Sequence, residues 1–572
     1  MQKTIDFLKQ HKIIILISLI TLAGLFLRLS TDLNELRNDE VATLMTASQN
    51  FPEGIINALL SKNLHAPLYY FILHFWIKLF GTDIFALRLL PILLGTLCIP
   101  ISYLCTKKLS STQAGILTAL LVAINPFLII FSNFAKFYAL LQLLGFLSIL
   151  FLIKTKENPK TSNIIMLAVV NALIVYTYVL GFLFVLIQFV LFTAYLCFKN
   201  EYKNFNNFFI KYPLILLLLI VPIMKMITLI VAKTQGGSLP TFWWYTFEIE
   251  DIYSVVYSWF SPGLPFMYMK GALTDPTQTY LSNKTFYMFI FNVIPLIIAS
   301  LGILKTLLKK NFVSLLFYIS FLFIIAELIG AILGKFAFCS RYTILAFPAI
   351  IIATAYGLSL IKKTKVTFVL ILVLCLVNFS YENIKVMKVY NTGASELKAI
   401  AEVLKSYSPK KTDFIIMPFR GYYLKAFYNT KNTNFISFDI NYSYKINDKN
   451  ILKNILDGKF IENKKLEPHK RFNDYLRTKT PSKQLSEYIQ KECLNRLNKN
   501  DRVFLIIYQH NNFSILDKII NDENYYKQQP MFTLLLLKIN YDLITIASEN
   551  LQLESEYENK SFTIYIYKNT KL

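Results

Sequence analysis

The sequence predicts a polytopic α-helical membrane protein, with a C-terminal α/β domain outside the membrane. Of the 572 residues 55% are hydrophobic and only 16% are charged, a balance that excludes an ordinary soluble globular chain. Apolar runs long enough to cross a bilayer recur as far as residue 380. Beyond Tyr381 the composition shifts to Lys, Asn, Glu and Tyr, and short helix and strand patterns alternate. We therefore expect two domains, 1–380 and 381–572.

About eleven apolar runs have the length, roughly 17–25 residues, that a helix needs to span a membrane. The first follows several lysines and has no small-residue cleavage pattern after it, which is typical of a retained signal anchor. The runs lie near residues 12–30, 87–106, 112–131, 137–153, 163–179, 181–198, 212–232, 285–304, 312–333, 343–361 and 366–380.

Charge sets the expected orientation of these spans. Lys and Arg total 59 against 35 Asp and Glu, a net charge of +24, and the basic residues gather in every second connection. Such alternation is the positive-inside pattern of a cytoplasmic face, so it explains the charge without nucleic acid. The loops 31–86 and 233–284 and the C-terminal domain are then extracytoplasmic. The basic clusters lie within residues 3–12, 107–108, 154–160, 199–211, 305–310 and 362–365.

The loop 31–86 carries the first candidate site. Asp39 and Glu40 lie just beyond the first span, where two adjacent carboxylates are costly unless they meet water, a cation or a substrate. One interpretation makes them catalytic, with a general base among them. The alternative is a solvated helix start, since Asn38 and Asp39 are both good N-cap residues.

His65 follows in the same loop, ahead of an aromatic, apolar stretch that ends at Phe80. The pattern 65–80 is typical of a helix that lies in the membrane interface. An imidazole can bind substrate, relay protons or ligate a metal, or it can be merely hydrogen-bonded. With Asp39 and Glu40 it offers oxygen and nitrogen ligands, so a divalent cation is the one cofactor left open. The spacing does not demand a metal, and none is assigned.

Two further candidate positions pair a cation with a tyrosine at the predicted outer ends of spans. Lys136 and Tyr138 lie in the short loop before the fourth span, and Arg341 and Tyr342 open the tenth. Fixed cations there can hold the phosphate of a lipid-linked substrate, and the planar fork of arginine suits phosphate oxygens. Alternatively, both cations reach toward lipid headgroups and only anchor the helices.

The tail predicts an α/β domain of about 190 residues. An amphipathic helix is expected over 394–407 and a charged helix over 482–497. Strands are expected over 413–418, 434–440, 502–508 and 562–567.

Together these motifs resemble a known family. The segments Asn38-Asp39-Glu40, His65-Ala66-Pro67-Leu68-Tyr69-Tyr70 to Phe80-Gly81, and Leu87-Arg88-Leu89 come in the order seen in GT-C glycosyltransferases. Ala135-Lys136-Phe137-Tyr138-Ala139-Leu140 and Arg341-Tyr342 with Pro348 follow in that order as well. The chain resembles the protein O-mannosyltransferase and aminoarabinose-transferase type (glycosyltransferase family 39-like) over roughly residues 10–380.

The resemblance implies an enzyme that moves a sugar from a polyprenyl-phosphate carrier to a lipid, glycan or protein acceptor on the extracytoplasmic face. It implies that Asp39 acts as base or orients the acceptor and that Arg341 holds the lipid phosphate. Lys136 stands where relatives usually have Arg, and Tyr178 where many have His. A single displacement would invert the anomeric configuration. The expected location is a bacterial inner membrane.

Two other function classes remain open. A lipid or solute transporter or flippase is favoured by the many spans and by Lys225 inside an apolar run, but transporters place their sites near the midplane. A non-catalytic assembly or receptor protein would use the tail as its binding module. The sugar, the acceptor and the oligomeric state do not follow from the sequence.

Overall fold

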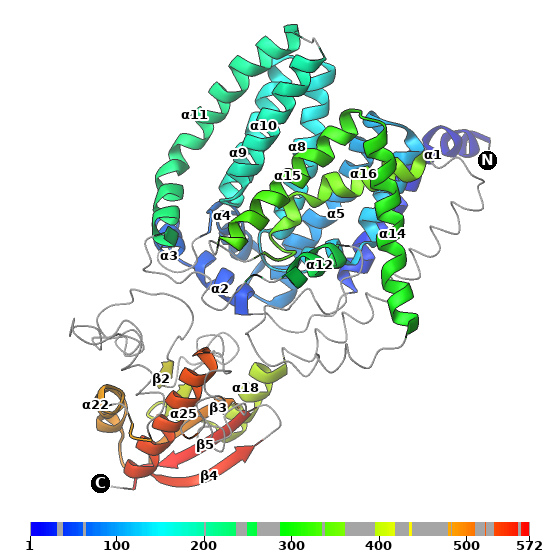
Figure 1. Ribbon diagram of the computed structural model, residues 1–572. Coiled ribbons are helices and arrows are strands. Elements are labelled where there is room, and N and C mark those ends of the chain that lie inside the picture. The colour runs from blue at the N-terminus through cyan, green and yellow to red at the C-terminus, as the bar shows by residue number, and fades with distance from the viewer. Residues whose placement is uncertain are drawn as a thin grey trace. The chain divides into compact units, whose positions relative to one another are not determined.

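The computed structural model divides into two compact units, residues 1–391 and 392–572. Each unit is described by itself (Figure 1). The structure describes residues 2–30, 38–60, 65–199, 202–235, 247, 249–259, 286–333, 338–360, 395–417, 434–437, 479–481, 483–508, 521, 531–558 and 562–570. The predicted eleventh span, 366–380, and the predicted domain border lie outside these residues.

The first unit is a bundle of helices, with short helices α2, α3 and α12 at one end (Figure 1). Its elements are α1 (Gln2–Leu29), α2 (Asn38–Ala47), α3 (Glu53–Ala58), α4 (Leu68–Phe80), α5 (Ile84–Leu109), α6 (Thr112–Ile124), α7 (Pro126–Ser132), α8 (Tyr138–Glu157), α9 (Thr161–Thr177), α10 (Gly181–Phe198), α11 (Tyr202–Gln235), α12 (Ile249–Ser258), α14 (Phe286–Leu308), α15 (Phe312–Ile332), the 3-10 turn η3 (Thr343–Leu345) and α16 (Phe347–Ser359).

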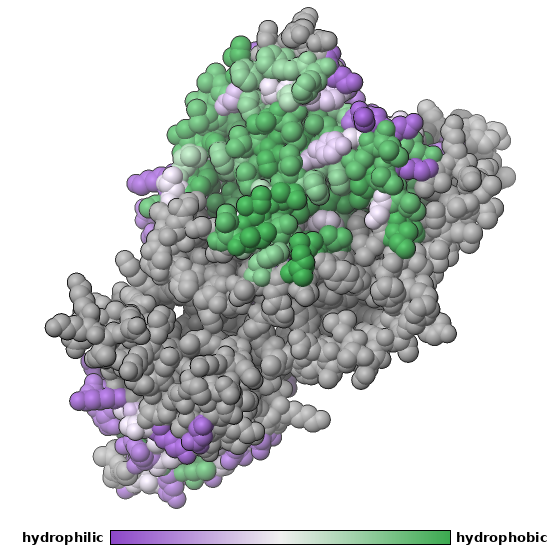
Figure 2. Space-filling view, in the orientation of Figure 1, coloured by the Kyte–Doolittle hydropathy of each residue, from purple (hydrophilic) through white to green (hydrophobic). Residues whose placement is uncertain are grey.

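The bundle is built to face lipid. In the described residues six helices are long and apolar enough to cross a membrane, or up to seven if α6 and α7 form one bent span. Figure 2 shows apolar side chains gathered over the helices of this unit. Soluble proteins rarely expose so many large apolar side chains to water, so the prediction of an integral membrane protein is confirmed. On α11 the exposed ones include Leu214, Leu217, Leu218 and Val221.

The predicted span 112–131 is not one straight helix, which corrects the sequence-based prediction. It breaks between α6 and α7 with a bend of 57°. Pro126 has no N–H to donate there, and the Asn125 side chain caps the new helix by accepting from the Leu128 amide at 3.0 Å. The buried carbonyl groups of Val122 and Ala123, next to the break, accept from the fully buried Arg28, both at 3.1 Å. Backbone groups at the break therefore have hydrogen-bond partners, so the bend is a stable part of the fold.

Polar side chains also join four helices inside the bundle. Asn171 of α9 donates to Gln188 of α10 at 2.7 Å and to the hydroxyl of Tyr212 on α11 at 2.5 Å. Ser148 of α8 donates to Asn171 at 2.7 Å. All four side chains are buried, and hydrogen bonds between buried polar groups fix the register of packed helices. Gln188 thus belongs to helix packing.

Helix α4 covers most of the stretch 65–80, for which the sequence predicts an interfacial helix. It has 13 residues, too few to span a bilayer, and it ends at Gly81, whose φ of 85° glycine adopts without steric cost. His74 Nδ1 lies 2.7 Å from the carbonyl oxygen of Ala47, and Trp76 donates to the carbonyl of Ala86 at 2.7 Å. Helix α4 therefore ties α2 to α5.

The second unit contains a mixed sheet with helices, so the predicted α/β class of the tail is confirmed. Its described strands follow the order β2-β1-β3-β5-β4. Strands β1, β2 and β3 run parallel, while β5 pairs antiparallel with both β3 and β4. The elements are α18 (Ser395–Tyr407), β1 (Phe414–Met417), β2 (Asn434–Ser437), α22 (Lys483–Glu492), η5 (Leu494–Arg496), β3 (Arg502–Tyr508), α25 (Met531–Asn550), β4 (Gln552–Glu558) and β5 (Phe562–Lys568).

Strand β4 and helix α25 were not predicted from the sequence. The strand reads Gln552-Leu553-Glu554-Ser555-Glu556-Tyr557-Glu558 and is exposed along nearly its whole length, so it shows no alternation of apolar and polar residues. As an edge strand it pairs only with β5, and its charges keep further strands from adding to the sheet. The apolar core lies between the inner strands and helices α22 and α25.

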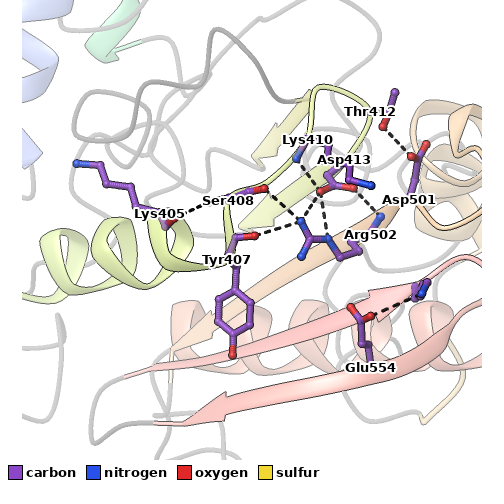
Figure 3. A network of polar contacts seen from close by, with 10 residues as sticks. Lys405, Tyr407, Ser408, Lys410, Thr412, Asp413, Asp501, Arg502 and Glu554 are labelled. Carbon is purple, nitrogen blue, oxygen red and sulfur yellow. Dashed lines mark hydrogen bonds and ion pairs between the residues drawn. The ribbon is translucent and has the colours of Figure 1, made fainter.

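A buried ion pair joins the start of two parallel strands in this unit. The Arg502 guanidinium lies 3.0 Å from Asp413 Oδ2, and the Arg502 amide donates to Oδ1 at 2.8 Å. The same guanidinium donates to the carbonyls of Tyr407 and Ser408 at the end of α18, at 3.2 and 3.3 Å. Figure 3 shows these groups converging on Arg502. The pair thus fixes α18, β1 and β3 to one another.

Replacing Asp413 with Ala should loosen the second unit locally. The change leaves a mostly buried guanidinium without its counter-ion, which typically costs about 3 kcal/mol. Hydrogen exchange followed by mass spectrometry on the full chain should show faster exchange in 413–417 and 502–508. Exchange within α5 and α8 should be unchanged.

Glu554→Ala supplies the matched control. Glu554 forms an ion pair with Lys568 at 3.8 Å, but both side chains are substantially exposed, so the pair is worth less than about 1 kcal/mol. Equal acceleration of exchange in the two variants would contradict the structural role assigned to Asp413.

Candidate active site

The site forms around the carboxylate of Asp39 in the first turn of α2. Lys136 Nζ lies 3.2 Å from Asp39 Oδ2, and Arg341 Nη1 lies 3.3 Å from the same oxygen. The three residues are separated by 97 and by 205 positions in the sequence, so only the fold brings them together. Lys136 is nearly buried, Arg341 is partly exposed, and the Asp39 side chain is half-exposed. One carboxylate therefore balances two cations at an accessible position.

These cations determine the ionisation of Asp39. The charge of Lys136 is the largest cause and that of Arg341 adds to it, and together they outweigh burial and hold the pKa of the carboxyl well below its usual range. Asp39 is thus ionised near neutral pH. A carboxylate held this way is a weak base until another anion takes its cations.

Glu40 differs from its neighbour, although the sequence suggested the same role for both. Its carboxylate is buried and bonded to both arms of the Arg88 guanidinium, with Nε at 3.4 Å and Nη2 at 3.2 Å. Glu40 Oε1 also accepts from the backbone amide of Ala135 at 2.8 Å. With these partners, Glu40 has a structural role. It fixes α2 to α5 and to the turn that carries Lys136.

His65 lies beside this cluster. Its ring contacts Phe137 at a centroid distance of 5.4 Å and stacks on Tyr70 at 6.4 Å. Burial, followed by the charge of Lys136, lowers the pKa of His65 to about 3. The imidazole is therefore neutral near pH 7, so it can accept or donate a hydrogen bond but brings no charge.

The two predicted tyrosines pack against the two cations. Lys136 Nζ lies 5.9 Å from the ring centroid of Tyr138, and the Arg341 guanidinium lies 5.1 Å from that of Tyr342. Arg341 Nη2 also donates to the hydroxyl of Tyr342 at 3.4 Å. All seven residues predicted for the site, Asp39, Glu40, His65, Lys136, Tyr138, Arg341 and Tyr342, thus fall in one region of the bundle.

Trp259, which follows α12, joins the turn after Arg341 to the break between α6 and α7. Its indole N–H donates to the Thr343 hydroxyl at 2.9 Å, just after Arg341. Its carbonyl accepts from the Asn125 side chain at 2.9 Å, at the helix break that leads through α7 to Lys136. Because Trp259, Thr343 and Asn125 are all buried, this link holds the turn after Arg341 against the break between α6 and α7.

The donor set does not fit the divalent cation that the sequence left open. Asp39 already faces two cations, and Glu40 is committed to Arg88 and to a backbone amide. Across the described residues no three His, Cys, Asp or Glu side chains are grouped as metal ligands. A dication beside Lys136 and Arg341 would meet net repulsion. We therefore derive no step through a metal.

Sequence reasoning overlooked Trp259 and Glu327. The tryptophan had no local signal, since its partners are 134 and 84 positions away. Glu327 did have one, because it is an acidic residue within the apolar run 312–333. Its carboxyl group is buried and accepts a hydrogen bond from the Tyr178 hydroxyl at 3.2 Å. Sequence reasoning noted Tyr178 as a departure from the family pattern but did not pair it with Glu327.

Part of the chain matches the model of a known protein family. Residues 64–226 match the model of a family described as dolichyl-phosphate-mannose-protein mannosyltransferase. The matched segment includes His65, Lys136 and Tyr138. A comparison with curated proteins finds no match to this chain.

Solved structures share the fold at low sequence identity. The oligosaccharyltransferase of Archaeoglobus fulgidus in the apo form has 13% identity and a TM-score of 0.52, over 90% of this chain and 72% of that one. ArnT from Cupriavidus metallidurans bound to undecaprenyl phosphate has 10% identity and a TM-score of 0.53, over 97% of this chain and 98% of that one. The A. fulgidus enzyme tethered with an acceptor peptide has 12% identity and a TM-score of 0.51, over 99% and 75%.

These findings confirm the predicted resemblance to GT-C glycosyltransferases, and they support an enzyme over the transporter alternative. Lys225, the residue that favoured a transporter, is exposed on α11. The chain is a membrane protein with the fold of these membrane glycosyltransferases, and its residues 64–226 match the model of the dolichyl-phosphate-mannose-protein mannosyltransferase family.

Proposed function

We propose that Asp39, Lys136 and Arg341 form the reaction centre of a membrane glycosyltransferase. The single observation that carries this proposal is the carboxylate of Asp39 shared between two cations, each within 3.3 Å of the same oxygen. A base beside two phosphate-binding cations is the set of groups that transfer from a sugar phosphate requires.

The donor in this proposal is a sugar joined to a polyprenyl phosphate. Its phosphate takes the place of the Asp39 carboxylate on Lys136 and Arg341, and its lipid tail lies along the apolar bundle. ArnT, one of the structures with this fold, is described as bound to undecaprenyl phosphate, which supports the same class of donor here. The partly exposed Arg341 offers its planar fork to two phosphate oxygens.

The reaction is one displacement at the anomeric carbon. Asp39 takes the proton of an acceptor hydroxyl while that oxygen forms a bond to the anomeric carbon. The bond from this carbon to the phosphate oxygen breaks, and the polyprenyl phosphate leaves with the electron pair. Lys136 and Arg341 stabilise the negative charge that grows on the phosphate. Attack opposite the leaving group inverts the configuration.

The Asp39 carboxylate and the donor phosphate bind the same two cations, so donor binding changes the basicity of Asp39. Without donor, Lys136 and Arg341 keep the pKa of Asp39 low, and the carboxylate is a poor proton acceptor. The donor phosphate draws both cations to itself, so Asp39 becomes more basic only once the sugar is in place. Premature reaction with water is suppressed by the same arrangement.

Glu40 and Trp259 are positioning residues in this proposal. Glu40 links α2 to Arg88 and to the Ala135 amide next to Lys136, and Trp259 fixes the turn after Arg341. Neither needs to touch the reacting atoms. The proposed location is a bacterial inner membrane, with the site and the second unit on the extracytoplasmic side, supported by the alternation of basic clusters.

Asp39→Asn should abolish transfer while the protein folds and inserts normally. The amide cannot take the acceptor proton, so the rate should fall at least about a hundredfold. Mass spectrometry of the cell envelope should then show accumulated polyprenyl-phosphate sugar and no modified product. Asp83→Asn is the control, since Asp83 only caps α5 and Asn caps equally well. Full turnover by Asp39→Asn would remove Asp39 from the mechanism.

Lys136→Met should move the acid limb of the kcat/KM profile to higher pH. Transfer needs Asp39 ionised, so activity falls as the pH drops through the pKa of its carboxyl group. Removing the largest cause of the lowered pKa raises it toward the ordinary value of about 4. The variant should lose activity between about pH 5 and pH 4, where the wild-type profile stays level. The exposed Lys78 supplies a Lys→Met control, and coincident acid limbs in variant and wild type would refute the assignment.

Trp259→Phe and Thr343→Ala should each weaken binding of undecaprenyl phosphate, and their effects should not add. Both changes break the same hydrogen bond, at 2.9 Å, that steadies the turn after Arg341. A double-mutant cycle on the affinity should give a coupling of about 1 kcal/mol. Strictly additive losses would show that the bond does not position the phosphate site.

A further inference from the structure

A second acidic group lies close to the reaction centre. Glu327 is on α15, five residues before the helix ends at Ile332, or about 7.5 Å along the axis. It is 1% exposed, and Oε1 accepts from the Tyr178 hydroxyl at 3.2 Å. Among the described residues Oε2 has no hydrogen-bond partner. A buried, half-satisfied carboxyl group in an apolar helix is costly, and such a residue calls for a functional explanation.

Tyr178 connects this carboxyl group to both cations of the site. Its ring stacks on that of Tyr342, with centroids 6.5 Å apart and planes 11° from parallel, and Tyr342 follows Arg341. On the other side it stacks on Phe137, at 6.0 Å and 24°, and Phe137 follows Lys136. Phe137, Tyr178 and Tyr342 thus form a row of aromatic rings, which we name the aromatic row. Glu327 is hydrogen-bonded to its middle member.

This arrangement has the chemistry of a sugar site. In the proposed function the phosphate lies on Lys136 and Arg341, and the sugar is bonded directly to that phosphate. Its ring must therefore lie close to the residues that flank the two cations, which are members of the aromatic row. Sugar rings present C–H groups that pack on aromatic faces, and hydroxyls that bond to carboxyl oxygens. A hydroxyl both donates and accepts, so it satisfies Oε2 in either protonation state of Glu327.

A purely structural role explains less. A tyrosine hydroxyl could bond equally well to a glutamine, which avoids placing an acid inside the bundle. The network of Ser148, Asn171, Gln188 and Tyr212 shows that amides and hydroxyls are sufficient to join these helices. Glu327 instead leaves one oxygen unused by the described residues, beside the reaction centre.

We propose that Glu327, held by Tyr178, binds a hydroxyl of the sugar carried by the lipid-phosphate donor. It is a substrate-binding residue that selects the sugar-loaded carrier over the bare carrier left after transfer. The inference rests on the proposed function, because it takes the phosphate to lie on Lys136 and Arg341. Lys136 and Arg341 cannot distinguish the two carriers, since both bear a phosphate. Glu327 adds a preference for the carrier that bears the sugar.

The test compares the two carriers on the same protein. The full chain is purified from its own membrane, and mass spectrometry measures the polyprenyl phosphate and polyprenyl-phosphate sugar retained with it. Glu327→Ala should keep bare polyprenyl phosphate at the wild-type level and lose about tenfold of the sugar-loaded form. Glu327→Gln, which preserves a partner for Tyr178, should show a smaller loss of the same form. Gln188→Met, which disturbs the polar network inside the bundle, should leave the ratio of the two lipids unchanged.

The possible outcomes distinguish failure of the sugar site from failure of the phosphate site. If Arg341→Met loses both lipids while Glu327→Ala keeps the wild-type ratio, the phosphate site stands and the sugar site is overturned. Equal loss of both lipids from Glu327→Ala also overturns it, since that is what a structural residue would do. If the wild-type protein retains neither lipid, the proposed function itself fails and the sugar site fails with it.

Discussion

The site depends on one electrostatic balance, the carboxylate of Asp39 against the cations of Lys136 and Arg341. Each partner comes from a different part of the chain, and neither cation would be stable so close to the other without the anion between them. Much of the surrounding architecture supports this balance. The pair of Glu40 with Arg88 sets the start of α2, and Trp259 ties the turn after Arg341 to the break between α6 and α7.

Helix α2, which carries Asp39, lies at one end of the helical bundle (Figure 1). Helix α4 links α2 to α5, and the break between α6 and α7 redirects the chain toward Lys136. Arg28 stabilises that break because its guanidinium donates hydrogen bonds to two carbonyl groups in the last turn of α6. Charged side chains thus serve two purposes in this unit: Arg28 satisfies the carbonyls at the bend, and Lys136 and Arg341 form the cluster around Asp39.

Sequence patterns predicted the features that depend on local composition. Apolar runs gave the helices of the bundle, and strand-like runs such as 502–508 gave the inner strands of the second unit. The candidate site residues were singled out because charged groups next to apolar runs are rare. The bent span was not predicted, although Asn125-Pro126 is a strong helix-breaking pair. Strand β4 was missed because an exposed, charged edge strand has no apolar alternation.

Other features could not follow from one sequence, because they are pairings between distant residues. Asp39 and Glu40 look alike in the chain, yet one is half-exposed between two cations and the other is buried against Arg88. Nothing local distinguishes them. The difference arises where α5 and the turn before α8 meet α2. The same holds for Glu327, whose position beside Tyr178 depends on the packing of α15 against the end of α9.

The most direct test of this account is the affinity for undecaprenyl phosphate of the wild-type protein and of Asp39→Asn, measured side by side in detergent. If the carboxylate competes with the donor phosphate for Lys136 and Arg341, its neutralisation should tighten binding several-fold while it stops turnover. Weaker binding by the variant would mean that Asp39 helps to hold the phosphate, and the balance of one anion with two shared cations would be wrong.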